Sequence, residues 1–105
     1  MTVVIVMDWE ETEADYFEIV SRMGVQGTPA EGIHLHVAGP TTHGIRIVEV
    51  WDELAGFEAF VRGVLLPTAE AAGIATKPTY ASFPVANLFA PGLEVLEKVA
   101  QRFAQ

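Results

Sequence analysis

Two histidines separated by one residue, His34 and His36, are the side chains of this chain best suited to chemistry. A neutral imidazole can take a proton from a phenol or an activated carbon acid near neutral pH. Side chains on a strand alternate between its faces, so the histidines share one face, and Ile33, Leu35 and Val37 form the opposite, helix-packed face. We expect the histidine face to line a cavity, with His36 as a catalytic base and His34 as a substrate-binding residue. The alternative is that both are wall or interface residues held by hydrogen bonds.

Glu49 is the second candidate catalytic residue, because it interrupts an otherwise apolar strand over residues 45–51. It shares a strand face with aliphatic side chains and Trp51. A carboxylate in such surroundings is either paired or poised as an acid or base. Its expected partner is Arg46, His36 or a backbone amide, and the register of the hairpin decides among them. The alternative is a paired glutamate at a sheet end or a dimer contact.

A metal site is a further alternative for the two histidines. With Glu49 or Asp8 they would supply the ligands of a facial triad. In cupins, however, a glutamate follows the His-x-His of the strand within a few residues, whereas Val37-Ala38-Gly39-Pro40 follows here. The chain also has no cysteine, no phosphate-binding glycine loop and no nucleophile-elbow serine. We therefore expect neither a metal nor a cofactor.

Three further residues are predicted to bind substrate together with His34. Trp51 and Tyr80 are suited to line a slot for a flat, apolar ligand. Asn87, just past the last predicted strand, is suited to orient a substrate oxygen. The alternative is that the aromatic residues belong to the core and that Asn87 caps a turn.

Composition narrows the class of protein. The chain has 105 residues, of which 50% are hydrophobic, and a formal net charge of −8. An acidic chain repels phosphate backbones and anionic lipid, so neither nucleic acid nor a membrane is an expected partner. No apolar run reaches the roughly 20 residues that span a bilayer, and the first residues lack the features of a signal peptide. We expect a soluble, cytoplasmic protein.

The pattern of apolar residues predicts the helices and strands. It indicates a strand over 2–8 buried on both faces, a helix over 12–23, and hairpin arms over 33–38 and 45–51. Asp52 is suited to cap the next helix, which Pro67 interrupts and which ends near residue 72. A strand over about 79–85, at a sheet edge because of Pro84, and a helix from residue 91 follow. We expect one domain over 1–105, with a core over 1–89 and an added helix over 90–105.

The predicted order β-α-β-β-α-β is the split βαβ, or ferredoxin-like, arrangement of the α+β class. It forms a four-stranded antiparallel sheet with two helices on one face. The apolar side chains on the other face need cover, and the same face of a second copy would supply it. We expect this homodimer, a closed α/β barrel between two subunits. The C-terminal helix is an alternative cover within one chain.

Val48-Glu49-Val50-Trp51-Asp52 followed by Phe57-Glu58-Ala59-Phe60, in this strand order and with histidine on the first hairpin arm, resembles the dimeric α+β barrel superfamily. Within it, residues 2–89 are most similar to the antibiotic-biosynthesis-monooxygenase-like domains. The resemblance implies a homodimer in which each sheet forms one wall of a cavity. Members include cofactor-independent oxygenases, polyketide cyclases, isomerases and haem-degrading enzymes. The haem-degrading enzymes have a pattern with a tryptophan and a histidine at the positions where this chain has Phe60 and Glu70, so the resemblance disfavours haem degradation.

Two functions follow as hypotheses. The first is a dimeric barrel that binds a small apolar or aromatic molecule and acts as a cofactor-independent monooxygenase, cyclase or isomerase. The second is a non-catalytic ligand-binding or interaction protein. Pairing of Glu49 with the histidines, and a cavity filled by side chains, would favour the second.

Overall fold

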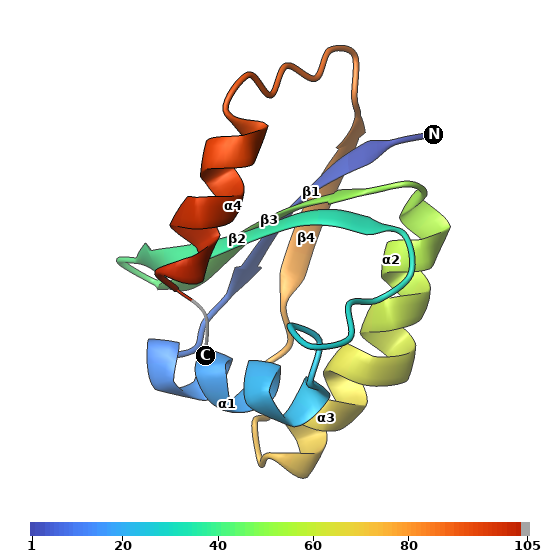
Figure 1. Cartoon of the computed structure of the whole chain (residues 1–105). Helices are drawn as coiled ribbons and strands as arrows, with labels where there is room; N and C mark the ends of the chain where they lie inside the picture. Colours follow the sequence, from blue (N-terminus) through green and yellow to red (C-terminus); the bar gives the residue numbers. More distant parts are fainter. Residues whose placement is uncertain (104–105) are drawn as a thin grey trace.

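The computed structural model describes residues 1–103, so the last two residues of the predicted C-terminal helix lie outside the described residues. Figure 1 shows the predicted order β-α-β-β-α-β and a further helix at the end. The elements are β1 (Val3–Trp9), α1 (Glu13–Met23), β2 (Ile33–Thr41), β3 (Gly44–Trp51), α2 (Leu54–Phe60), the π-helical turn η1 (Val61–Leu65), α3 (Leu66–Ala71), β4 (Thr79–Pro84) and α4 (Leu93–Gln101). The chain thus has the expected ferredoxin-like α+β fold.

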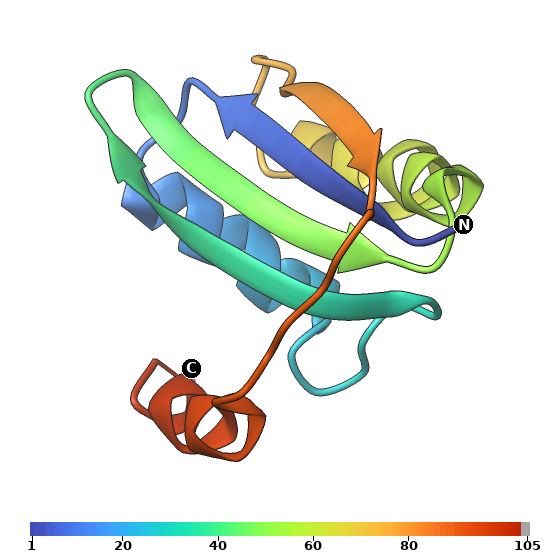
Figure 2. The same cartoon turned by 90° about the horizontal axis from the view of Figure 1, so that it is seen from above.

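The four strands form one antiparallel sheet in the order β2-β3-β1-β4, and α1, α2 and α3 cover one of its faces (Figure 2). In the central strands Ile5 of β1 lies opposite Glu49 of β3, and His36 of β2 lies opposite the same glutamate. Pro84 is the last residue of the edge strand β4, a position where its missing N–H is tolerated. The register therefore places Ile5, Glu49 and His36 in one row on one face of the sheet.

The hydrophobic core lies between the helices and the helix-covered face of the sheet. Its largest fully buried side chains are Trp51, Phe57, Ile5 and Ile19. The rings of Trp51 and Phe57 meet edge to face, with centroids 5.9 Å apart and planes at 72°, an arrangement that aromatic pairs favour. Burial of side chains of this size contributes about 1.5–3 kcal/mol each. Together they fix α2 against β3.

The opposite, open face of the sheet is covered less than the sequence predicts. Val4 and Val6 of β1 are only partly buried, because no helix of residues 1–103 packs on that side. On the edge strands, Val37 and Phe83 are 54% and 52% exposed. The expectation that β1 is buried on both faces is therefore wrong for the single chain.

The C-terminal helix does not cover this open face. Figure 2 shows α4 standing apart from the sheet, at the end of a connection over residues 85–92. No residue of α4 is buried, and Leu93 and Leu96 of its apolar stripe are 58% and 44% exposed. Within the connection, Phe89 is 82% exposed. The alternative in which α4 shields the sheet of its own chain is therefore wrong.

The ends of the helices follow local sequence chemistry, with one exception. The Thr12 hydroxyl accepts a hydrogen bond from the backbone N–H of Asp15 (3.1 Å), and Gly24 ends α1 at φ 66°. The predicted interruption at Pro67 is wrong, because η1 widens the helix instead. The N–H of Leu66 bonds to the carbonyl of Val61, five residues earlier, and the wider turn accommodates the proline ring.

Candidate functional site

A chain of hydrogen bonds crosses the helix-covered side of the sheet from α1 to β3. Nδ1 of His36 lies 2.5 Å from Oε2 of Glu49. The indole N–H of Trp51 donates to the other carboxylate oxygen, Oε1, at 2.9 Å. At the other end, the Tyr16 hydroxyl contacts Nε2 of His36. Helix α1 and the two arms of the hairpin, β2 and β3, therefore place four polar groups in one line.

The face that carries His36 is opposite to the one expected from strand alternation. Ile33 pairs with Trp51, but Leu35 pairs with Val50, so the register shifts by one residue within β2. This β-bulge puts Leu35 on the open face and His36 on the helix-covered face. The expectation that His36 faces a cavity opposite the helices is wrong, as is the helix-packed position expected for Leu35 and Val37. Among the expected partners of Glu49, the register selects His36.

The carboxylate of Glu49 is buried, and its environment compensates for the loss of water. Glu49 is 6% exposed, and its two oxygens accept from separate donors on His36 and Trp51. An unpaired carboxylate at this depth would be strongly unfavourable. Among residues 1–103, no buried side-chain nitrogen or oxygen lacks a partner. The pair is therefore a fully satisfied polar unit inside an apolar core.

Tyr16 takes part in this row of hydrogen bonds, but it is not among the predicted site residues. Burial raises the pKa of Tyr16 to about 12, and the negative charge of Glu49 adds to the rise. The phenol is therefore protonated at neutral pH. Its ring is nearly parallel to that of His36, at 15° and with centroids 6.0 Å apart. Its place beside the apolar stripe of α1 is the sequence signal, but only the packing of α1 on β2 brings it to His36.

His34 lies outside this chain of hydrogen bonds. It sits at the bulge in β2, where Nε2 lies 2.5 Å from Oδ1 of Asp52, and both side chains are more than half exposed. Asp52 was expected to cap α2, but the N-cap is Glu53 and makes no side-chain cap bond. The pairing with His34 occupies the Asp52 carboxylate instead. In the single chain His34 is thus held at the exposed surface, and its part in a substrate cavity stays a prediction.

The other predicted substrate-binding residues are dispersed. Trp51 donates to Glu49 through its indole nitrogen, while its ring is buried in the core. Tyr80 lies on the helix side of β4, packs edge-on against Phe57 and donates its hydroxyl to Glu58 at 3.0 Å. Asn87 is exposed in the connection to α4. In the single chain only Trp51 contacts Glu49, and substrate binding by these residues stays a prediction.

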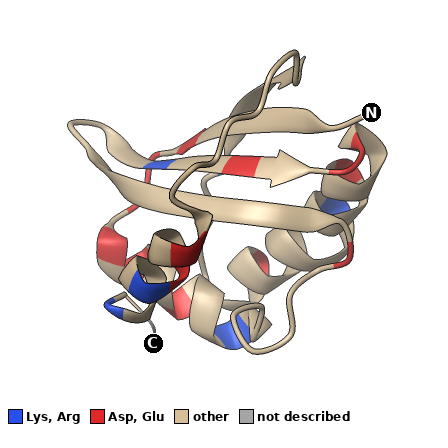
Figure 3. Cartoon of the chain, turned by 45° about the horizontal axis from the view of Figure 1, so that its top comes forward, with Lys and Arg blue, Asp and Glu red and all other residues tan. Residues whose placement is uncertain are grey.

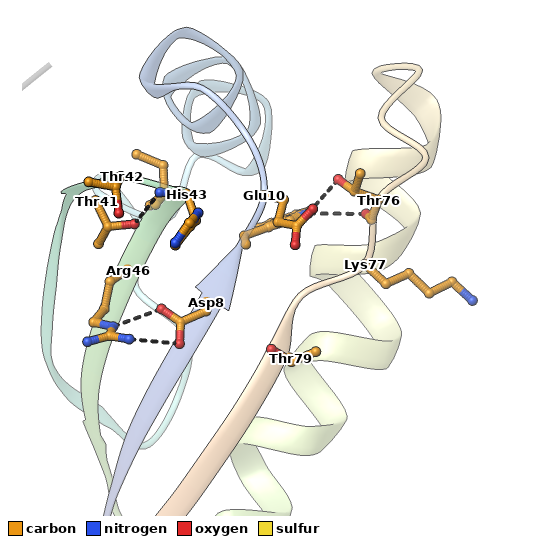
Figure 4. A pocket seen from close by; sticks show the side chains of 11 residues that line it. Asp8, Glu10, Thr41, Thr42, His43, Arg46, Thr76, Lys77 and Thr79 are labelled. Atoms are coloured by element: carbon orange, nitrogen blue, oxygen red, sulfur yellow. Dashed lines mark hydrogen bonds and ion pairs between the residues drawn. The ribbon is translucent and has the colours of Figure 1, made fainter.

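A hollow lies elsewhere, at the end of the sheet where β1 and β4 approach the hairpin connection (Figure 4). It has a volume of about 690 Å³, opens to solvent and has a wall of mixed polar and apolar side chains. Arg46 donates to both oxygens of Asp8 there, at 2.8 and 3.1 Å, which lowers the pKa of Asp8. A second hollow of about 300 Å³ lies beside Met1 and Phe83. Neither hollow is lined by His36.

Neither a metal centre nor a membrane-spanning helix is found in the described part of the chain. Among residues 1–103, no three His, Asp or Glu side chains come close enough together to hold a metal ion. No helix in this range has the length and apolar character that crossing a bilayer requires. Figure 3 shows acidic residues distributed over helices and strands, with the few basic residues scattered among them.

No family model and no curated protein matches this sequence. Solved structures do match. SnoaB, a cofactor-independent oxygenase from Streptomyces nogalater, aligns in a mutant form with a TM-score of 0.59 and 16% identity over 84% of this chain and 96% of its own. Rv0793 from Mycobacterium tuberculosis aligns with a TM-score of 0.61 and 7% identity over 84% of this chain and 98% of its own. A protein from Caulobacter crescentus, described as a candidate antibiotic biosynthesis monooxygenase, aligns with a TM-score of 0.58 and 11% identity over 82% of this chain and 91% of its own.

The chain has the antibiotic-biosynthesis-monooxygenase-type fold. This agrees with the resemblance read from the sequence around Glu49 and Trp51. At these identities the likeness establishes the arrangement of helices and strands, and the chemistry rests on the side chains of this chain.

Proposed function

We propose that this protein is a small enzyme that removes a proton from a flat, apolar, aromatic molecule without a cofactor. The observation that carries the proposal is the His36–Glu49 pair, with Nδ1 2.5 Å from a buried carboxylate. A carboxylate behind an imidazole fixes the ring and stabilises the imidazolium that forms when the ring accepts a proton. Support also comes from the fold shared with SnoaB, a cofactor-independent oxygenase.

His36 is the base in this proposal, and Glu49 orients it. The Trp51 indole holds the second oxygen of Glu49, so the carboxylate cannot rotate without losing a hydrogen bond. Removal of a proton from an activated carbon leaves a carbanion, which can cyclise, take the proton back at another position, or transfer electrons to dioxygen. In the oxidative case a methylene group and O₂ give a carbonyl group and one water molecule. The dioxygen accepts the electrons, so the balance requires no further reductant.

We also propose that the enzyme is a cytoplasmic homodimer whose subunits meet through the open faces of their sheets. The open face exposes apolar side chains on both edge strands, including Val37 and Phe83. The apolar stripe of α4, a helix of nine residues, is likewise uncovered. Isolated helices shorter than about 12 residues are marginal in water, so α4 needs a packing partner. A second copy would cover both surfaces, and light scattering of the eluting protein measures the subunit number.

Anthrone oxidation tests the proposed activity, because the anthrone methylene is acidic and its carbanion reacts with dioxygen. Oxygen uptake and anthraquinone formation are measured together for the wild type and for His36→Gln. We expect the variant to lose at least about 100-fold in rate, the usual contribution of a positioned base. His43→Gln, on an exposed histidine of the hairpin connection, is the matched control and should retain the wild-type rate. Equal rates for His36→Gln and the wild type would exclude His36 as the base.

The second candidate is a non-catalytic ligand-binding or interaction protein. It is favoured by two observations: Glu49 is paired with His36, whose ring nitrogens are both hydrogen-bonded, and neither hollow described above is lined by His36. In that case the pair stabilises the core and nothing more. His36→Gln would then lower the free energy of unfolding, and the wild type would not accelerate anthrone oxidation.

A further inference from the structure

We propose that the Tyr16 hydroxyl is the group that meets the substrate, with His36 behind it as the final proton acceptor and Glu49 as a positioning residue. This inference rests on the proposed proton-abstracting function and assigns the site a further catalytic residue. It changes which atom touches the reacting carbon. The substrate would dock at the edge of the sheet, where α1 faces β2.

The argument starts from the two nitrogens of His36. Nδ1 is bound to Glu49 and Nε2 to Tyr16, so neither nitrogen is free to receive a proton directly from a substrate. The ring is one-third exposed, at 34% of its side chain, and its inner edge faces the buried carboxylate. A proton reaches Nε2 only if Tyr16 leaves or if the proton passes through the Tyr16 oxygen. The second route keeps every hydrogen bond in place.

The direction of the hydrogen bonds follows from the acceptor at the inner end. The indole N–H of Trp51 can only donate, and it donates to Oε1 of Glu49. A carboxylate that also faces Nδ1 through Oε2 accepts there, so Nδ1 carries the hydrogen. Nε2 of the neutral ring is then an acceptor, and the Tyr16 hydroxyl donates to it. The phenol oxygen keeps its lone pairs for a substrate.

The proton transfer is balanced. The substrate proton moves to the Tyr16 oxygen while the Tyr16 proton moves to Nε2, and the substrate is left as an anion. His36 becomes an imidazolium beside the Glu49 carboxylate, where the opposite charges attract in a buried setting. The raised pKa of Tyr16 fits a relay, since a neutral phenol is present throughout the neutral range. A free tyrosinate is not required at any step.

The first test needs no substrate. Long-range proton–nitrogen NMR of imidazole-labelled protein reports which ring nitrogen of His36 carries the hydrogen. We expect the Nδ1–H form for the wild type at neutral pH. Tyr16→Phe keeps the ring on α1 but removes the donor, so the Nε2 resonance should shift while Nδ1–H is retained. An Nε2–H form in the wild type would overturn the relay.

The second test uses anthrone as the probe and compares Tyr16→Phe with His36→Gln. We expect both to lose at least about 100-fold in kcat, as acid–base groups do. Ser21→Ala, which removes an exposed hydroxyl from the same helix, is the control and should keep the wild-type rate. A wild-type rate for Tyr16→Phe with an inactive His36→Gln overturns the role of Tyr16 and leaves the proposed function standing. A wild type that does not accelerate the reaction overturns both.

Discussion

Replacement of Glu49 by glutamine is the perturbation that examines the buried pair most directly. Glutamine keeps the shape of the side chain but offers one acceptor oxygen where the carboxylate offers two. Trp51 and Nδ1 of His36 each need an acceptor, so one of the two bonds is lost or His36 must change its tautomer. A hydrogen bond to a charged group contributes about 1.5–3 kcal/mol. We expect Glu49→Gln to lower the free energy of unfolding by this amount.

The same substitution should have a different effect once His36 is absent. In a His36→Ala background the carboxylate of Glu49, which is 6% exposed in the wild type, has lost the imidazole that donates to it. A neutral amide is easier to bury than an unpaired carboxylate. Glu49→Gln should therefore be neutral or stabilising in that background. The difference between the two backgrounds is the coupling energy of the pair, which we expect to be at least about 1.5 kcal/mol.

Urea unfolding at neutral pH, followed by tryptophan fluorescence, measures all four proteins of this cycle. Protein concentration is held constant, because association with a second copy would raise the apparent stability. Equal slopes with denaturant show that the variants unfold from comparable native states. Coupling below about 0.5 kcal/mol would mean that the two substitutions are independent and would refute the pairing. The exposed pair of Asp8 and Arg46 serves as the control cycle and should show smaller coupling.

Three further predictions follow from other parts of the molecule. Burial raises the pKa of Tyr16 to about 12, so its neutral form stabilises the fold fully below pH 10, and this contribution is lost as the pH rises through 12. The difference in unfolding free energy between the wild type and Tyr16→Phe, measured by urea unfolding, should therefore fall across that range. Gly44→Ala should destabilise the fold by at least about 2 kcal/mol, because φ is 151° and a Cβ would meet the Trp9 carbonyl oxygen. A Tm within about 2 °C of the wild-type value would contradict this prediction. Leu96→Glu, on the exposed apolar stripe of α4, should weaken the proposed dimer in light scattering, whereas Gln101→Glu on the polar side should not.

Much of the fold was predictable because it depends on local sequence. The β-branched run of β1, the Thr12 cap and Gly24 each act within a few residues, and they define β1 and the bounds of α1. The prediction at Pro67 was wrong because a helix can widen by one residue and continue. Such a π-helical turn depends on how the flanking helices pack.

The candidate site was only partly predictable. An acidic residue in an apolar strand identified Glu49, and alternation placed it beside Trp51, as the structure has it. Alternation failed for His36 because the bulge at His34 inserts an extra residue into β2 and reverses the faces that follow. Local sequence does not mark the bulge, which forms when the hairpin register is set by the core.

The sequence by itself determined the order of the elements, the apolar stripes and the presence of an acid and two histidines on one hairpin. Only the tertiary structure decided that Glu49 pairs with His36, that Tyr16 completes the chain, and that His34 is held by Asp52. The physical reason is the distance along the sequence over which each effect acts. Propensity and periodicity act over a few residues, whereas these contacts join side chains up to 20 positions apart and depend on strand register and on how α1 packs against the sheet.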